Sequence, residues 1–355
     1  MKLKSMILAS AASLFAVNGA VAADAIVAVD PEPVDYVQIC DAYGAGFFFI
    51  PGTEVCLDIS GRVRVQYGYT NPAGPNNNRF EQDVDYRVQF DARHETDLGT
   101  VRSFIEIGDQ GYVSQRGSFL ESVQPNLVFI QIIGANGVTF TTGLAESLYD
   151  GESIMTALTF ANGGFTGGIA YEDRNVAGLA RNANLVGVAN IGTNRLGGND
   201  DAITANLGYS VDGFSVTGEI AYELGRAANG VNAPLSWNVG ASYTGDRFGI
   251  ALNYEAATGV SYARNFDFNN YEAIRFGRDE LSIDLDLTLT DKLSASSDWD
   301  VLFNAQGWAV ENTLAYAVSS NFSIEAEFDY VSDMGVDNRT NDRTWHLGLD
   351  FIATF

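Results

Sequence analysis

The chain has two histidines, His94 and His346, and they are its candidates for general-base chemistry. A hydrolase built on a serine nucleophile needs a histidine beside that serine and an acid or amide that orients the ring. His94 falls on the apolar parity near the end of an expected strand, and the sequence singles out no serine for His346. We therefore predict that the protein is not an enzyme, and a hydrolase remains the disfavoured alternative.

Two other groups offer metal ligands. Residues 197–201, Gly-Gly-Asn-Asp-Asp, provide oxygen atoms for calcium but lack the ligand spacing of a calcium loop, so a solvated loop tip is the simpler interpretation. Cys40 and Cys56 are the only cysteines, and a metal site built on them would need histidines that their surroundings lack. We predict no bound metal and no cofactor.

The N-terminus has the pattern of a secretory signal peptide. Lys2 and Lys4 precede an uncharged apolar run at residues 6–17, and small residues follow at 20–23. We predict a signal peptide at 1–22, an N-terminal segment with a disulfide loop at 23–56, and the main domain at 57–355. In an exported chain, the isolated pair Cys40 and Cys56 predicts a disulfide worth about 3 kcal/mol on the chain-entropy account.

Charge and composition exclude several classes of protein. A formal net charge of −25 argues against nucleic acid as a partner and against electrostatic binding to an anionic membrane surface. After the signal peptide, no apolar run approaches the roughly 18 residues that a membrane-spanning helix needs. The 37 glycines, 16 tyrosines and 22 phenylalanines, with only 18% charged residues, are typical of a sheet with lipid outside and water inside.

Alternating apolar and polar residues define the elements that carry the charged groups. At the C-terminus, Trp345, Leu347 and Leu349 share one parity, whereas His346 and Asp350 fall on the other. This period of two predicts a strand with one apolar face and one polar face. The same pattern predicts sixteen strands, near residues 57–69, 83–95, 101–108, 125–134, 138–143, 154–161, 165–172, 202–209, 214–223, 236–244, 248–255, 280–289, 293–301, 308–316, 322–330 and 343–355.

The connections between these strands alternate between short and long. Short turns such as 96–99 and 210–213 alternate with longer loops such as 109–124 and 173–201. We therefore predict an all-β protein, a sixteen-stranded antiparallel transmembrane β-barrel with short periplasmic turns and long outer loops. The alternative is a soluble β-sandwich, whose apolar face would need a second covering sheet.

The residues around the two cysteines resemble a known family. The stretch Cys40-Asp-Ala-Tyr-Gly-Ala-Gly-Phe-Phe-Phe-Ile-Pro-Gly-Thr-Glu-Val-Cys56-Leu57 is similar to one that alphaproteobacterial porins carry directly after an Ala-rich signal peptide. Phe355 at the end and the hairpin rhythm between extend the resemblance loosely over the chain. It implies a homotrimeric outer-membrane porin in contact with membrane lipid and lipopolysaccharide. The alternative of another class is a structural or adhesive barrel plugged by its loops.

The polar parity carries too many charges for a dry interior, because each unpaired buried charge would cost several kcal/mol. It predicts a water-filled channel for passive diffusion of small hydrophilic solutes and ions. Sixteen to eighteen strands leave room for such a channel. The side chains expected to line the pore are Arg62, Arg64, Arg87, Arg93, Arg102, Asp83, Asp85, Glu106, Glu146, Asp150, Glu219, Glu223, Asp284, Asp286, Glu325 and Glu327.

The excess of acids on this parity predicts a modest preference for cations. The arginines gather on the first three strands, so we expect a field from them across the pore towards Glu219, Glu223 and Glu255. The third outer loop of such porins is long and folds into the lumen, but here the corresponding loop, residues 144–153, is short. We therefore expect the longer, weakly charged loop at 173–201 to fold inward and share the constriction.

Overall fold

The structure is a computed structural model that describes residues 38–71, 80–109, 124–149, 151–173, 201–224, 235–258, 279–303, 307–332 and 344–355. These residues belong to one compact unit, Val37–Phe355. The expected signal peptide, the middle of the 173–201 loop and most of the candidate calcium ligands lie outside them. The elements are η1 (Asp41–Tyr43), β1 (Phe48–Phe49), β2 (Cys56–Asn71), β3 (Phe80–Thr96), β4 (Gly99–Asp109), β5 (Gln124–Ile133), β6 (Val138–Glu146), β7 (Glu152–Asn162), β8 (Phe165–Asp173), β9 (Asp201–Val211), β10 (Phe214–Glu223), β11 (Leu235–Thr244), β12 (Phe248–Thr258), β13 (Asp279–Thr290), β14 (Leu293–Leu302), β15 (Gly307–Ser319), β16 (Phe322–Val331) and β17 (Thr344–Thr354).

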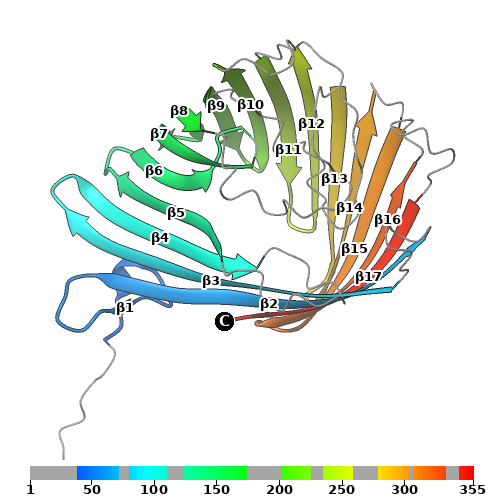
Figure 1. Ribbon diagram of the computed structural model, residues 1–355, viewed down its shortest axis with the longest axis horizontal. Coiled ribbons are helices and arrows are strands. Elements are labelled where there is room, and N and C mark those ends of the chain that lie inside the picture. The colour runs from blue at the N-terminus through cyan, green and yellow to red at the C-terminus, as the bar shows by residue number, and fades with distance from the viewer. Residues whose placement is uncertain are drawn as a thin grey trace, which may run out of the picture. The chain divides into compact units, whose positions relative to one another are not determined.

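Each strand from β2 to β17 pairs antiparallel with its neighbour in the chain, and the last strand returns to the first (Figure 1). The β17–β2 ladder runs from Trp345 opposite Asn71 to Thr354 opposite Arg62. Beyond the ladder, Gly61 and Phe355 exchange two backbone hydrogen bonds of 2.9 and 3.1 Å. This pairing closes the sheet, so the predicted sixteen-stranded barrel is confirmed.

The alternation of short and long connections is also present. The β9–β10 hairpin turns on Asp212 and Gly213, whose φ angles are 47° and 82°. A type I′ turn needs positive φ at both central residues, and it matches the twist of the paired strands. Such tight turns lie at the end of the barrel where β2 begins, and the longer connections lie at the other end.

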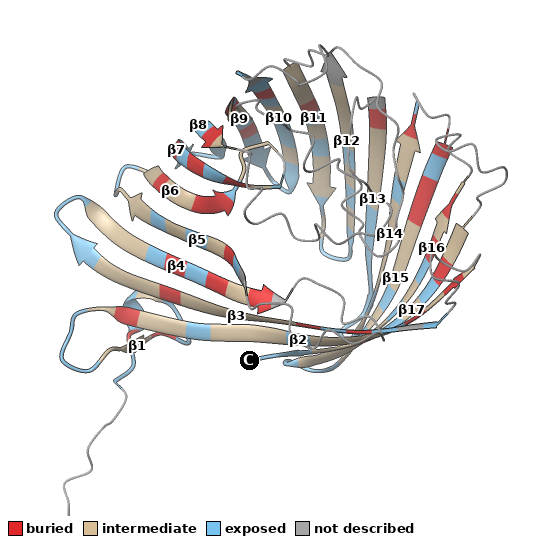
Figure 2. Cartoon of the chain, viewed as in Figure 1, coloured by how far each residue is buried: buried red, intermediate tan, exposed pale blue. Residues whose placement is uncertain are grey.

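The two faces of the barrel differ as the parity pattern predicts. Large apolar side chains such as Leu158, Ile169 and Leu207 are more than half exposed. Polar residues of the opposite parity, including Glu172 and Asp350, are fully buried. Buried positions are scattered over many strands instead of forming one core (Figure 2). An apolar outer surface over a polar interior is the arrangement of a barrel that spans lipid.

No helix in the part of the chain that the structure describes is long and apolar enough to cross a membrane.

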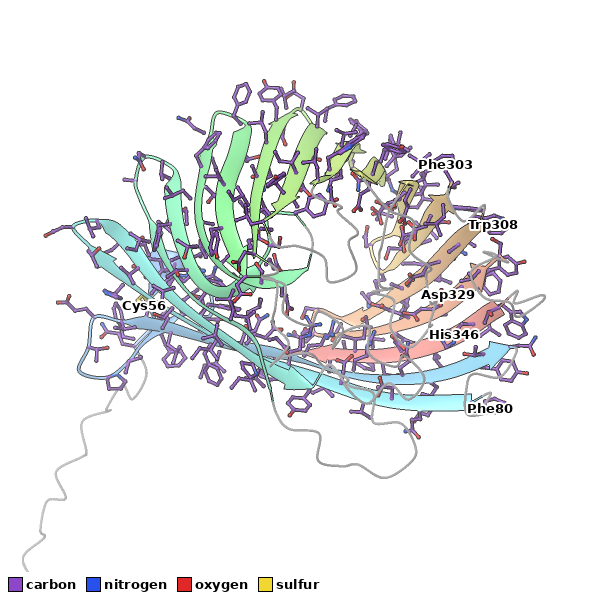
Figure 3. The ribbon with its side chains drawn as sticks, turned by 45° about the horizontal axis from the view of Figure 1, so that its top comes forward. Cys56, Phe80, Phe303, Trp308, Asp329 and His346 are labelled. Atoms are coloured by element: carbon purple, nitrogen blue, oxygen red, sulfur yellow. A yellow bond between two sulfur atoms is a disulfide. The ribbon has the colours of Figure 1, made fainter. Side chains whose placement is uncertain are left out.

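Aromatic side chains gather at both ends of the strands. At the long-loop end, Trp308 lies 5.6 Å from Trp299 and 5.0 Å from Tyr330, measured between ring centroids. Figure 3 labels Trp308 with Phe80 and Phe303 at this end of the barrel. At the short-turn end, aromatic rings contact one another in the pairs Phe165–Tyr209, Phe214–Tyr243 and Tyr243–Phe248. Two aromatic belts are what a membrane barrel places at its two lipid–water interfaces.

The disulfide loop packs against the first two barrel strands. Cys40 and Cys56 are bonded, as predicted, with their Cα atoms 5.9 Å apart. The two-residue strand β1 pairs with the start of β2, and Phe47 lies under the guanidinium of Arg93, which is 5.0 Å from the ring centroid. The Tyr43 hydroxyl donates a hydrogen bond of 2.9 Å to Glu95. The loop therefore braces the inward face of β2 and β3 at the short-turn end.

Removing this disulfide should destabilise the barrel without preventing its formation. Replacing Cys40 and Cys56 together by alanine should lower the free energy of unfolding by about 3 kcal/mol, because the unfolded chain regains the entropy of an open loop. Urea unfolding in detergent would measure the loss. Reducing the wild-type protein serves as the matched control, and an unchanged stability in both cases would contradict the bracing role.

Candidate functional site

The lumen-facing arginines of β2 lie beside carboxylates. Arg64 donates through Nε to Oδ2 of Asp85 at 2.7 Å, and its Nη1 lies 3.5 Å from Oδ2 of Asp350 on β17. Arg62 reaches the other oxygen of Asp85 at 3.3 Å. The side chain of Asp350 is only 1% exposed. Arg64 thus lies between an acid on β3 and an acid on β17, and Arg62 shares the acid on β3.

The arginines of β3 and β4 are paired in the same way. Arg93 binds Asp91 through two hydrogen bonds of 2.7 and 2.9 Å, and Arg102 donates to the same carboxylate at 3.0 Å. Arg87 lies 3.7 Å from Glu106. Because these charge-assisted bonds neutralise each arginine locally, β2 to β4 form a mixed wall and not a bare positive one.

Four acidic residues form a row across neighbouring strands of the inner face. Asp284 on β13, Asp298 on β14, Glu311 on β15 and Asp329 on β16 stand directly opposite one another in successive strand pairs. We call these four residues the acidic row. The row continues to His346 on β17 and then to Thr70 on β2. In the strand order, the row lies between the arginines of β2 and the acids Glu219 on β10 and Glu255 on β12, so the field expected across the pore stays a prediction.

The connection between β6 and β7 folds over the inner wall. It is even shorter than the expected loop 144–153, since only residues 147–151 lie between the two strands. The fully buried Glu172 on β8 accepts a hydrogen bond of 2.7 Å from the Ser147 hydroxyl and one of 3.1 Å from the Leu148 backbone amide. Thr204 on β9 also donates to Glu172. One buried carboxylate thus anchors the turn.

The wall beneath this turn is apolar. Ala145, Met155, Ala157 and Ala170 form a buried cluster on β6 to β8, and Leu148 packs against it. The three alanines leave space for the turn inside the barrel, because larger inward side chains would occupy the same volume. The turn therefore rests on the inner surface through apolar contact and is fixed there by Glu172.

This anchoring carries Tyr149 across the lumen. Its hydroxyl donates a hydrogen bond of 2.7 Å to Oε1 of Glu255 on β12. Tyr149 and residues of β10 to β13 line a cavity of about 380 Å³ that is open to the lumen, and its polar lining includes Glu219, Asn238 and Asp284. Among the residues with described positions, the short β6–β7 turn narrows this part of the lumen. The contribution expected from the loop at 173–201 falls on residues outside the described part of the chain.

The other expected pore-lining residues are distributed over the same face. Asp83 is buried on β3, Glu219 accepts a hydrogen bond of 2.6 Å from Asn238, and Glu325 accepts one of 3.2 Å from Ser323. Asp286 is exposed on the lumen parity of β13, and Glu146 is exposed at the end of β6. Asp150 and the side chain of Glu223 lie outside the described residues.

Sequence reasoning missed Tyr149 and Glu172 as partners. Glu172 shares the inward parity, which was visible, but its role depends on the turn folding back over β8. Tyr149 carries no periodic signal because it lies in a turn. His346 was recognised as lumen-facing, and the structure adds its neighbours: its Nδ1 lies 2.9 Å from the Thr70 hydroxyl, and Asp329 stands opposite it.

The closed barrel, its apolar outer surface, its aromatic belts and its charged interior define an outer-membrane β-barrel. Comparison with known sequences agrees. The chain belongs to the Porin subfamily, whose family profile matches residues 24–349.

Relatives of this chain carry the name porin. It is 34% identical over 242 residues to Porin Omp2b of Brucella melitensis biotype 1 and equally so to Porin Omp2b of Brucella suis biovar 1. Each alignment covers 63% of this chain and 63% of the relative, so the match spans less than two thirds of those proteins.

Solved porins share the fold at low sequence identity. The Salmonella typhi OmpF complex with daunomycin superposes with a TM-score of 0.63 at 13% identity, covering 85% of this chain and 98% of that one. A triple mutant of the Rhodopseudomonas blastica porin gives 0.57 at 14% identity, covering 83% and 99%. At such identities the likeness concerns the fold alone.

Proposed function

We propose that the protein is a diffusion porin, a water-filled channel through which small hydrophilic solutes and ions cross the outer membrane passively. The observation that carries this proposal is the closed sixteen-stranded barrel whose inner face is lined by ionised side chains. Such a face needs water, because the free-energy cost of removing so many charges from water would exceed the attraction gained from their ion pairs. The proposed assembly is a homotrimer, which rests on the family resemblance.

The proposal includes a preference for cations. Each lumen-facing arginine on β2 to β4 has a carboxylate partner, and carboxylates outnumber arginines among the inward residues with described positions. Carboxylates along a pore attract cations and raise the barrier for anions. Salt screens this effect, since the Debye length is about 8 Å at physiological ionic strength.

Planar bilayers test both parts of the proposal. We expect stable ohmic conductance steps and a reversal potential that indicates cation preference in a KCl gradient, strongest at low salt. A plugged structural barrel would give no stable steps. Anion preference at low salt would contradict the charge argument while leaving the channel intact.

The proposal assigns no catalytic role to the chain. In the described contacts of His346, the hydroxyl group of Thr70 lies at Nδ1, and Asp329 is the residue opposite on the neighbouring strand. Nucleophilic catalysis would need a serine or cysteine oriented towards an imidazole base, whereas both cysteines are bonded to each other. We expect the purified protein to hydrolyse neither esters nor peptides.

A further inference from the structure

The acidic row ends in an arrangement with a different chemistry from the rest of the lumen. Glu327 and Asp329 lie on the same face of β16, and Asp329 stands opposite His346 on β17. One ligand atom from each of the three side chains can be chosen so that all lie within 4.8 Å of one another. Among the described residues, this is the group of three histidine, cysteine, aspartate or glutamate side chains whose ligand atoms lie this close together.

Burial distinguishes this cluster from a solvated acidic face. Asp329 is 5% exposed and His346 is 7% exposed, whereas Glu327 is partly open to the lumen. Oδ1 of Asp329 is buried and has no hydrogen-bond partner within the described part of the chain. A buried carboxylate oxygen without a donor is costly, and Glu311 on the neighbouring strand adds a like charge opposite it. A cation would remove both penalties.

The histidine is oriented as a metal ligand would be. Its Nδ1 is engaged by the hydroxyl of Thr70, which is itself 4% exposed. In metal sites, a contact of this kind at one ring nitrogen fixes the orientation of the ring and presents the other nitrogen to the ion. Here that other nitrogen is Nε2.

Gly348 shows where Nε2 and the carboxylate of Glu327 meet. A Cβ atom added to Gly348 would lie 2.8 Å from Oε2 of Glu327 and 3.4 Å from Nε2 of His346. The missing side chain therefore leaves a space that both ligand atoms face. Gln66 donates to the same Oε2 at 3.3 Å and holds the carboxylate over this space. Figure 3 shows Asp329 and His346 close together on neighbouring strands.

We propose that Glu327, Asp329 and His346 form a binding site for a divalent transition-metal ion of the zinc type. An imidazole nitrogen with two carboxylates suits zinc better than magnesium or calcium, which prefer oxygen ligands alone. Three protein ligands leave a fourth position for water, which the lumen supplies beside Glu327. The ion enters from the lumen and places two positive charges at the end of the acidic row.

The test is zinc binding by the full-length folded protein without a histidine tag, stripped of metal and titrated calorimetrically in detergent with excess Mg²⁺ present. We expect one Zn²⁺ per chain. His346→Asn and Asp329→Asn should abolish this binding, and Thr70→Val should weaken it by about 10- to 100-fold, as loss of an orienting partner does. Binding is measured without a membrane, so its outcome is independent of channel function.

Matched controls separate the site from general attraction to the acidic lumen. His94→Asn changes the other histidine and Asp286→Asn removes another lumen acid, and both should retain wild-type affinity. Gly348→Ala should weaken binding by filling the space over which the ligands meet, whereas Gly218→Ala, whose added Cβ has its nearest neighbour at 3.9 Å, should not.

Copper binding to the His94→Asn protein gives a test that does not depend on whether the His346 variants fold. The electron paramagnetic resonance spectrum of the bound Cu²⁺ should show hyperfine coupling to an imidazole nitrogen, which only His346 can supply in this variant. Absence of zinc binding in the wild type, wild-type affinity in folded His346→Asn, or equal losses in Asp329→Asn and Asp286→Asn would each overturn the proposal. So would copper signals without imidazole coupling.

Discussion

Arg64→Met should lower the free energy of unfolding by about 3–5 kcal/mol, the usual cost of removing one partner from a buried ion pair. Arg64 is the cation that the structure places beside Asp350, at 3.5 Å, and the side chain of Asp350 is only 1% exposed. Methionine retains much of the stem and removes the charge. Asp85 keeps its contact with Arg62, so the expected loss comes mainly from Asp350. Urea titration of folding into lipid vesicles measures it.

Arg87→Met is the matched control. Its side chain is 39% exposed and its Nη1 lies 3.7 Å from Glu106, which also accepts hydrogen bonds from Gln89 and Asn126. Because Glu106 keeps those two donors, the control should cost no more than about 1 kcal/mol. Adding Asp350→Asn to Arg64→Met should recover part of the loss, since the unpaired charge is gone. Equal losses for the two arginine variants would contradict this account.

The barrel could be predicted from the sequence because a strand repeats its chemistry every second residue. Trp345, Leu347 and Leu349 had to share one face and His346 and Asp350 the other, whatever their neighbours were. Counting such segments gave the sixteen strands that the register closes through the β17–β2 pair. The disulfide was predictable as well, since an exported chain with two nearby cysteines offers no other thiol.

Contacts across the lumen could not be predicted in this way. Parity places Arg64 and Asp350 on the inner face but does not say that strand register sets them within reach across the seam. Parity alone therefore does not show that these arginines are paired with acids. The pairing of Tyr149 with Glu255 joins residues 106 positions apart, and it depends on the direction in which one turn folds. Such pairs follow from the closed three-dimensional arrangement and leave no local pattern.

That turn leads to the second large effect, an increase in single-channel conductance in Tyr149→Ala. The phenol reaches from the β6–β7 turn to Glu255 on β12 and borders the cavity beside β10 to β13. Truncation to alanine removes the ring that lines this space and leaves the turn fixed by Glu172, so the open cross-section should grow without loss of fold. Conductance steps in planar bilayers, recorded for variant and wild type in the same salt, measure the change.

Tyr149→Phe separates the volume of the ring from its hydrogen bond. Phenylalanine keeps the obstruction but cannot donate to Glu255, so its conductance should stay near the wild-type value, with more variation between open levels because the ring is no longer tethered. Glu255→Gln provides the reciprocal control, since its carbonyl oxygen can still accept from Tyr149 while one lumen charge is lost. That variant should show a smaller cation preference at unchanged width. If Tyr149→Ala conducts no better than Tyr149→Phe, the ring does not limit the flow of ions and the constriction lies elsewhere in the lumen.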